Sequence, residues 1–247
     1  TLLYLPKEDE KYILAKAAPM LRERGKENPR QWMELQDYVV YLLCQRKEYE
    51  KAAACIKEAE KYASEVGDPY IWGRYYDMKA GMYDEMLNGA YDDTGKKEQC
   101  LIHKMLRAVD KSINCMKRAG GKEAERQAVK YTYGKIFLLI RCMPERDRKI
   151  KRLIGEMEEV LNREGSYRME FHFFHYMAKA WYFTLCREKA EQVLYNLKKA
   201  GKCSIPDGRS DLDQIDYWII PGANMLLELG KADQAGEWLV KGKTLCE

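Results

Sequence analysis

The sequence predicts an all-α protein, and three observations carry that prediction. Apolar residues recur every three or four positions nearly from end to end, which is the period of an α-helix. Strand-like alternation is absent, and the Asn88-Gly89 and Asp207-Gly208 dipeptides lie in polar stretches instead of joining two β-branched runs. The 247 residues include only 7 prolines, so long helices can run without interruption.

The apolar periodicity predicts about eleven helices. The first follows Pro6, continues through Tyr12 and Leu21, and ends at Gly25. The second is expected after Asn28-Pro29 and the third before Gly67-Asp68-Pro69, because these residue types favour helix starts and stops. The stripes that mark the second and later helices are Leu35–Leu43, Ala52–Ala63, Tyr75–Met86, Leu101–Met116, Val129–Ile140, Ile150–Leu161, Phe171–Leu185, Val193–Leu197, Ile215–Leu229 and Trp238–Leu245.

Two connections between these helices are longer and more polar than the rest. They are Asn88–Lys97 and Gly201–Asp213, and both contain glycine. Loops of this kind either carry a docking contact or simply join two helices, and the sequence leaves both interpretations open.

Composition indicates a folded protein and does not require a charged partner. Hydrophobic residues make up 46% of the chain and charged residues 33%, which is enough to bury a core. The 43 basic and 39 acidic side chains give a net charge of +4, so neither nucleic acid nor a membrane surface is implied. Runs of purely aliphatic or aromatic residues, such as Tyr38–Leu43 and Ile136–Ile140, are far shorter than a membrane span.

Other features favour a cytoplasmic protein. The eight cysteines form no CxxC pair, which is typical of thiols in a reducing compartment. The N-terminal segment becomes charged almost at once, so no signal peptide is expected. The first residue is threonine rather than methionine, and the chain is therefore interpreted as a module of a longer protein.

A repeat runs through the predicted helices. Three alanines share one register, each standing four positions before a large apolar residue: Ala52 with Ile56, Ala190 with Leu194, and Ala235 with Leu239. Small residues where two helices cross let the backbones approach, and the large residue fills the groove beside them.

This pattern resembles the tetratricopeptide repeat, a helix–turn–helix unit. Six positions match one copy of its signature, namely Phe174, Met177, Ala178, Trp181, Ala190 and Leu194. The segment Glu228–Ala235 is similar to the family's inter-helix turn, and Tyr133-Gly134 with Phe137 resembles a further first helix. The chain departs from the family at three positions. Val40 replaces a small residue, Gly222 stands where Leu is usual, and Pro221 interrupts a helix.

The resemblance implies a single tetratricopeptide-like domain over 1–247, with an N-terminal helix in 1–27 and about five degenerate pairs in 28–247. Such pairs stack into a right-handed superhelix, an α-solenoid whose first helices line a concave face suited to a peptide. Close helix crossings are expected at six alanines: Ala52, Ala59, Ala178, Ala190, Ala223 and Ala235. The family's clamp for a C-terminal carboxylate is not carried over, because its positions here hold residues such as Asp37, Tyr131 and His175.

The sequence carries no recognisable catalytic or metal-binding motif. His172 and His175 share one helical face but lack an obvious third ligand, so packing among aromatic residues is the favoured interpretation. No GxSxG, GxxxxGK[ST] or GxGxxG motif occurs. Cys186 lies about 16 Å along the helix from His175, too far for a thiol–imidazole pair. We therefore expect no enzyme activity, no metal and no cofactor.

The expected site is a partner-binding face. Tyrosine occurs 18 times against 5 phenylalanines, and tyrosine is favoured at interfaces because it combines apolar area with a hydroxyl. The first-helix register places five residues towards the concave face, where a protein or peptide would bind: Tyr131, Lys135, His175, Lys179 and Tyr182.

A basic stretch is a second candidate surface. Residues 117–152 contain twelve basic and four acidic side chains, whereas 204–247 contain four basic and eight acidic ones. The stretch culminates in a basic patch of Arg146, Arg148, Lys149, Lys151 and Arg152. A solvated helix face, an acidic peptide and nucleic acid all remain open as interpretations.

The sequence thus predicts a non-catalytic protein–protein or peptide-binding scaffold. It is expected to be the regulatory or sensor part of a larger cytoplasmic protein in bacterial signalling or transcription control. The alternatives are a nucleic-acid-associated regulator that uses the 117–152 stretch, and an enzyme with an unrecognised site. The oligomeric state is not predicted.

Overall fold

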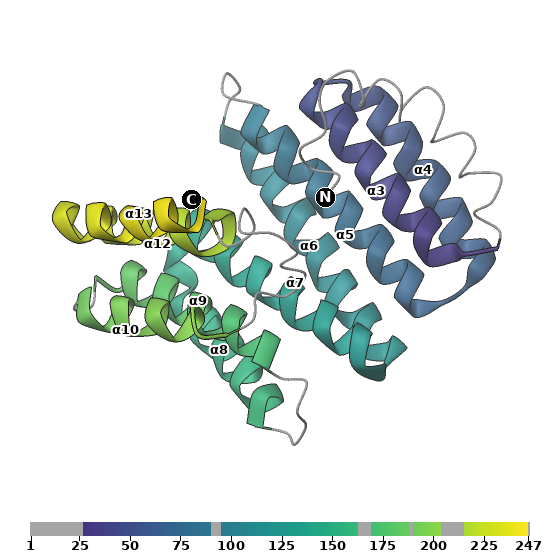
Figure 1. Cartoon of the computed structure of the whole chain (residues 1–247). Coiled ribbons are helices and arrows are strands. Elements are labelled where there is room, and N and C mark those ends of the chain that lie inside the picture. Colours follow the sequence, from purple (N-terminus) through teal and green to yellow (C-terminus); the bar gives the residue numbers. More distant parts are fainter. Residues whose placement is uncertain (1–26, 90–94, 163–168, 188–189, 204–214, 247) are drawn as a thin grey trace. The chain divides into compact units, whose positions relative to one another are not determined.

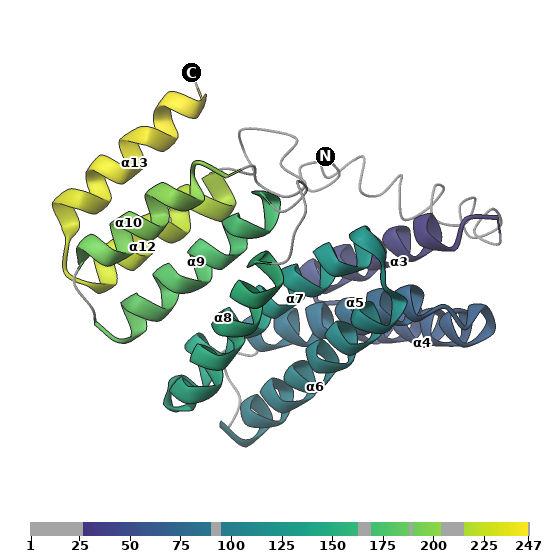
Figure 2. The ribbon, with the colours of Figure 1, turned by 90° about the horizontal axis from the view of Figure 1, so that it is seen from below.

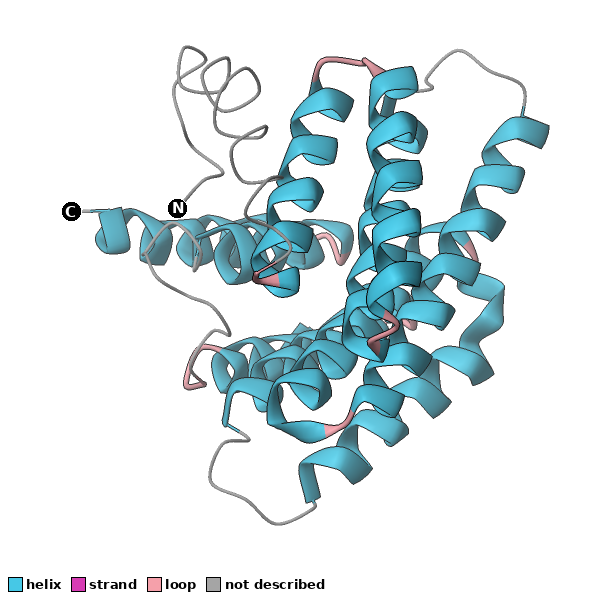
Figure 3. Ribbon diagram, turned by 90° about the vertical axis from the view of Figure 1, so that its right-hand side faces the viewer, coloured by secondary structure: helices cyan, strands magenta, loops and turns pink. Residues whose placement is uncertain are grey.

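The computed structural model of the chain describes residues 27–89, 95–162, 169–187, 190–203 and 215–246. Every regular element in these ranges is a helix and none is a strand (Figure 3), so the all-α prediction is confirmed. Within them lie ten α-helices, one 3-10 turn and one π-helix. The helix predicted through Tyr12 and Leu21 lies outside the described residues, and the total of about eleven stays a prediction.

Each apolar stripe from Leu35 onwards coincides with a helix. The stripe Ile215–Leu229, which contains Pro221, combines a π-helix with an α-helix. The elements follow one another along the chain as Figure 1 shows. Their bounds are α3 Pro29–Gln45, α4 Tyr49–Val66, α5 Pro69–Gly89, α6 Gly95–Ala119, α7 Gly121–Cys142, η3 Pro144–Arg146, α8 Asp147–Asn162, α9 Met169–Leu185, α10 Ala190–Ala200, η5 Ile215–Ile219, α12 Ile220–Glu228 and α13 Ala232–Cys246.

The predicted helix ends are confirmed where their chemistry is simplest. The Asn28 side chain accepts a hydrogen bond from the Gln31 backbone N–H at 3.3 Å and so caps α3. Gly67 ends α4 with a left-handed φ of 71°, a conformation that favours glycine. The Asp68 carboxylate then accepts from the Tyr70 N–H at 2.8 Å, at the start of α5.

The first of the two longer connections is shorter than the sequence predicted. Helix α5 continues through Gly89 and α6 begins at Gly95, so both ends of the expected Asn88–Lys97 loop are helical. In the second connection, Gly201 and Cys203 close the end of α10 with turn hydrogen bonds. Residues 204–213 of that connection lie outside the described part of the chain.

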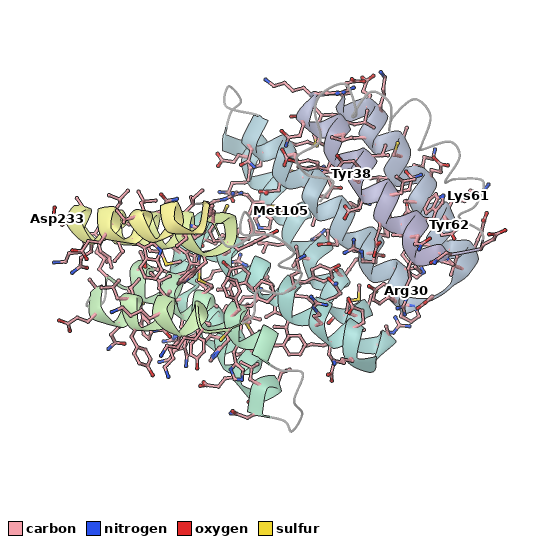
Figure 4. The ribbon with its side chains drawn as sticks, in the orientation of Figure 1. Arg30, Tyr38, Lys61, Tyr62, Met105 and Asp233 are labelled. Carbon is pink, nitrogen blue, oxygen red and sulfur yellow. The ribbon has the colours of Figure 1, made fainter. Side chains whose placement is uncertain are left out.

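The helices form two compact units, Thr1–Tyr131 and Thr132–Glu247, and the boundary falls inside α7. In unit 1, each of α3, α4 and α5 packs on the next helix, and α3 also packs on α5. The Ala52 and Ala59 side chains of α4 are fully buried in this core, as predicted for close crossings. Tyr62 of α4, labelled in Figure 4, packs its ring 4.0 Å from that of Trp32 in α3.

Helices α5 and α6 make the closest pairing in unit 1. Gly73 of α5 lies so near Met116 that a Cβ on the glycine would be 2.7 Å from the Met116 methyl carbon. The Ser112 hydroxyl of α6 donates to the Gly73 carbonyl at 2.9 Å. This bond satisfies the buried hydroxyl and fixes the register of the two helices.

Unit 2 repeats the paired arrangement. Helix α9 packs on α8 before it and on α10 after it, and α12 packs on α13 and on α9 (Figures 1 and 2). The first helix of each successive pair is α3, α5, α7, α9 or η5–α12, and the α-helix that follows it along the chain is the second helix of that pair. First helices of successive pairs are therefore in contact at α3–α5 and at α9–α12.

The proline that departs from the repeat pattern lies at a change of helix type. Pro221 has no N–H to donate, and the wider π-helical turn η5 ends two residues before it, at Ile219. Gly222, the other departure, faces Trp238 of α13, and a Cβ there would lie 2.4 Å from the indole nitrogen. A leucine at this position would not fit beside Trp238.

The alanine register holds in α4 but is wrong in α10 and partly wrong in α13. Val193, Leu197 and Ala200 form the buried face of α10, whereas Ala190 and Leu194 are only half-buried. In α13, Ala235 is buried but Leu239 is 48% exposed. Trp238 takes the inward position instead, because its ring packs edge-on against Trp218 at 5.1 Å. The other predicted crossings, Ala178 and Ala223, are buried.

Candidate functional site

A charged cluster connects three first helices in unit 1. Arg74 of α5 places one guanidinium nitrogen, Nη2, 3.2 Å from Asp37 Oδ2 of α3. Its other terminal nitrogen, Nη1, donates to the Tyr131 hydroxyl of α7 at 3.2 Å and lies 3.7 Å from Asp77 Oδ2. The planar guanidinium can bridge these groups because its donors point in several fixed directions. One arginine thus ties α3, α5 and α7 together.

Burial dominates the electrostatics of this cluster. It raises the pKa of Asp37 to about 6, with Arg74 opposing the shift and Asp77 adding to it. Burial likewise raises the pKa of Asp77, against the attraction of Arg74 and Lys130. The Asp37 side chain nevertheless keeps 38% of its surface exposed and that of Asp77 31%, whereas Arg74 keeps 15%. The cluster therefore holds a carboxyl group, Asp37, whose pKa burial raises and whose side chain solvent still reaches.

The five residues predicted to face a partner do not form one open surface. Tyr131, Lys135 and His175 are buried, at 5%, 7% and 4% exposure. Tyr131 belongs to the unit 1 cluster, and the other four belong to unit 2. Lys179 is half-buried and pairs with Glu158 of α8 at 3.2 Å, while the half-buried Tyr182 hydroxyl donates to Asp147 of α8 at 2.7 Å. These two side chains line the seam between α8 and α9.

His175 is the most isolated polar group in that seam. Its Nε2 atom has no hydrogen-bond partner in the described part of the chain. Burial lowers its pKa to about 4, Lys179 lowers it further, and Glu158 opposes the shift. The imidazole is neutral at pH 7, and the packing interpretation agrees with its surroundings of aromatic rings. Among the described residues, no three His, Cys, Asp or Glu side chains converge as a metal site would need.

An aromatic cluster connects the first helices of unit 2. Tyr133 of α7 packs on Phe174 of α9 with ring centres 5.3 Å apart, and Phe137 packs edge-on against Trp181 at 5.1 Å. Burial raises the pKa of Tyr133 to about 12, and the nearby Trp181 indole opposes the shift. The Trp181 indole N–H has no acceptor at hydrogen-bond geometry within the described residues.

Tyr217 of η5 completes the aromatic cluster and is its most exposed member. Its side chain is 41% exposed, whereas those of Phe174 and Trp181 are buried. The Tyr217 hydroxyl lies near enough to Tyr133 that a negative charge on Tyr217 would raise the pKa of Tyr133 further. The sequence shows the excess of tyrosine but does not single out Tyr217. This residue lies in a π-helix, where the α-helical period no longer predicts which face a residue is on.

The basic patch spans η3 and the first half of α8. Arg146, Arg148, Lys151 and Arg152 are exposed, and Lys149 is half-buried. Arg152 lies 3.5 Å from Glu156, one turn further along the helix, and both side chains are largely in solvent. The structure therefore presents the patch at the surface of η3 and α8, and what it contacts stays a prediction.

Two open hollows occur elsewhere on the described surface. One, of about 460 Å³, lies at the turns of the last two helix pairs, and the other, of about 520 Å³, lies on α4 and α5. Both are lined by side chains of mixed charge rather than by a nucleophile beside a base. The first contains Arg187, Ala190, Glu191, Glu228, Leu229, Lys231 and Gln234, and the second Lys57, Glu60, Lys61, Ser64, Glu65 and Trp72.

Within the described ranges, no helix combines the length and the apolar character that a membrane crossing requires. Among the cysteines, seven have described side chains, and all seven are free thiols. Comparison of the chain with protein-family models, with curated protein sequences and with solved structures gave no match in any of the three.

Proposed function

We propose that this chain is a protein–protein interaction module of tetratricopeptide-like helix pairs stacked into a right-handed superhelix. The contacts of first helices at α3–α5 and α9–α12 support this arrangement, since stacking of successive pairs brings first helices together. In this proposal the chain is the non-catalytic sensor or docking part of a larger regulatory protein. Its partner is a protein or a peptide.

The observation that carries the proposal is the aromatic cluster of unit 2. Three successive first helices each contribute to it: Tyr133 and Phe137 from α7, Phe174 and Trp181 from α9, and Tyr217 from η5. Aromatic rings that are partly open to solvent bury large apolar areas on binding while their polar atoms keep a hydrogen-bond partner. We assign the bound segment an apolar or aromatic side chain that packs on Tyr217 and Phe137.

The sequence-predicted residues take a different role in this proposal. Lys179 and Tyr182 hold α9 against α8, and His175 packs beside them. They position α9, whose opposite contacts with α7 form the aromatic cluster. Substitution of Lys179 or Tyr182 is therefore expected to act on the orientation of α9 rather than on a direct contact with the peptide.

The test is peptide selection followed by a matched pair of variants. Peptides are first selected from a displayed random library on the whole chain, and their affinities are then measured by calorimetry. Tyr217→Ala should weaken binding about tenfold or more if Tyr217 is an anchor of the interface. Tyr195→Ala is the control, because Tyr195 is a comparably exposed tyrosine at 58% on the second helix α10.

Equal affinities of wild type and both variants would reject the aromatic cluster as the binding site. Loss of binding in the Tyr195 variant alone would move the site to the second helices. Tyr133→Phe supplies a further comparison, because it removes one hydroxyl and keeps the ring contact with Phe174. Any loss of affinity there would measure a hydrogen bond to the peptide.

A further inference from the structure

The strongest charged surface of unit 2 is the basic patch of η3 and α8. Arg146, Arg148 and Lys151 are exposed, and the structure records no ion pair or hydrogen bond for these three side chains in the described part of the chain. Arg152 pairs with Glu156, but its side chain is 68% exposed and that of Glu156 43%. An ion pair so open to water holds its partners weakly. The patch thus carries cations whose charge is not neutralised by any described side chain of the unit.

These cations lie at the end of α8 where a positive charge is least favourable. The helix dipole favours acidic side chains in the first turn and basic ones in the last turn. In α8 the basic residues occupy the first two turns, whereas Glu156, Glu158 and Glu159 follow in the second half and the last turn has no basic residue. The one acid of the first turn, Asp147, accepts the hydrogen bond of Tyr182 from α9.

Folding of α8 does not depend on this arrangement of charges. Its buried face consists of Ile150, Leu153, Ile154, Met157 and Leu161. This face supplies the packing that a globular protein uses to stabilise an amphipathic helix. The basic patch therefore adds a cost to folding that a bound anion would reduce.

We propose that the basic patch docks an acidic segment of a partner protein. From Arg146 at the end of η3 to Lys151 in α8 the chain rises about 8 Å at helical spacing, which matches a short cluster of about three carboxylates opposite the three unpaired cations. Arginine side chains bind carboxylates through two parallel hydrogen bonds, which gives such a contact direction as well as charge. The acidic segment binds to a second helix, so this surface is additional to the aromatic cluster and does not depend on it.

Nucleic acid fits the same surface less well. Duplex DNA carries about one negative charge per 1.7 Å of its axis, so a strand that followed α8 would continue past the patch. It would then meet Glu156, Glu158 and Glu159, of which Glu158 and Glu159 are exposed. A short acidic peptide ends before these glutamates, whereas a nucleic-acid backbone does not.

The experiment measures binding of a labelled Asp/Glu-rich peptide to the whole chain by fluorescence anisotropy. The double variant Arg148→Glu with Lys151→Glu reverses two of the three unpaired charges of the patch. The control is Lys57→Glu with Lys61→Glu, which changes the net charge equally on the exposed face of α4. We expect the patch variant to raise Kd at least about tenfold and the control to change it less than about twofold. Binding of wild type should weaken as salt is raised from about 50 to about 200 mM.

Thermal unfolding measured by circular dichroism adds a second readout. If the basic residues served only the fold, their replacement would lower the unfolding temperature. The patch variant should unfold at a temperature equal to wild type or about 1–3 °C higher, because it places acids at the start of α8. Loss of binding together with retained or increased stability supports a binding surface. A lower unfolding temperature would show that the cations serve the fold and would overturn the proposal.

Two further outcomes would also overturn it. A single-stranded oligonucleotide that binds more tightly than the peptide and displaces it would make the patch a nucleic-acid surface. Equal loss of peptide binding in the α4 control would show that only net charge matters. Neither result bears on the aromatic cluster, whose test uses Tyr217→Ala, so the two proposals fail separately.

Discussion

The two units join their first helices by different chemistry. In unit 1, Arg74 bridges Asp37, Asp77 and Tyr131 and connects three helices through charged hydrogen bonds. In unit 2, rings of Tyr133 and Phe137 on α7 pack against rings of α9. Charged bridges depend on every partner being present and ionised, whereas ring packing depends only on shape and area.

This difference predicts how each unit responds to the loss of one side chain. Removal of Arg74 leaves two carboxylates without their cation, but removal of one ring leaves an apolar space. The difference also supports the proposal that the aromatic cluster is the binding surface. Its polar atoms are few, and a partner can cover it without breaking an ion pair.

The largest effect is expected from Arg74→Met, which removes the cation and keeps much of the side-chain volume. Urea unfolding should show a loss of about 2–4 kcal/mol, somewhat below that for a fully buried pair because Asp37 is 38% exposed. Hydrogen exchange read by mass spectrometry should show the loss of protection in residues 27–131. Arg74→Lys, which keeps the charge without the planar fork, should lose less stability. Equal stability of wild type and the methionine variant would show that the bridge does not hold unit 1.

The next largest effects are expected from replacing glycines that lie close to a neighbouring helix in each unit. Gly222→Ala should cost about 1–3 kcal/mol, because the new Cβ would lie 2.4 Å from the rigid indole of Trp238. Gly73→Ala in unit 1 should cost less, since the flexible end of Met116 can move away. Gly236→Ala on α13 is the control, with open space around its Cβ, and should stabilise by about 0.5–1 kcal/mol. A harmless Gly222→Ala variant would mean that α12 and α13 are not packed this closely.

Opposite pH responses sharpen the comparison further. The pKa of Asp37 is raised to about 6, so between pH 4 and 6 the folded chain binds more protons there than the unfolded chain, and stability falls as pH rises. With solvent around this side chain, the loss from pH 5 to pH 7 should be about 1 kcal/mol. The pKa of His175 is lowered to about 4, so its contribution is present above pH 6.5 and falls by about 2 kcal/mol at pH 5.

Variants isolate these two contributions. Urea unfolding gives the free energy of unfolding of each protein at pH 5 and at pH 7. Asp37→Asn should remove the decrease in this free energy between pH 5 and pH 7, and His175→Gln should remove the increase. Unchanged differences in either variant would contradict the assignment of that group.

The smallest effect concerns the exposed ion pair that connects α8 and α9. Lys179→Met should change the free energy of unfolding by no more than about 0.5–1 kcal/mol, because Lys179 and Glu158 are 28% and 50% exposed. Thermal unfolding of this variant beside Arg74→Met compares an open pair with a mostly buried one. A loss as large as that of Arg74→Met would show that the two units depend on charge equally.

Helix positions were predictable because their signals are local. Asn28 and Pro29 start α3, Gly67 ends α4, and apolar stripes mark the interiors, so each helix could be placed from its own residues. The candidate site was less predictable. Tyr131 and His175 were assigned to an open face from the repeat register, and a small rotation of a helix turns such a residue into the interior.

The basic patch shows the intermediate case. Its exposure was expected from the charge run, since five basic residues within seven positions cannot all be buried. The opposition between its charges and the helix dipole became visible only once α8 was known to begin at Asp147. The same residues in the last turn of a helix would have stabilised it.

By itself, the sequence determined that the described part of this chain is helical and where the interior of each helix lies, because capping and periodicity act within a few residues of each other. Only the tertiary structure decided which side chains meet. Arg74 reaches Asp37 across 37 positions of the chain, and Trp238 rather than Leu239 turns inward because Gly222 and Trp218 lie opposite. Such contacts depend on the rotation and spacing of packed helices, and side chains far apart in the sequence set both.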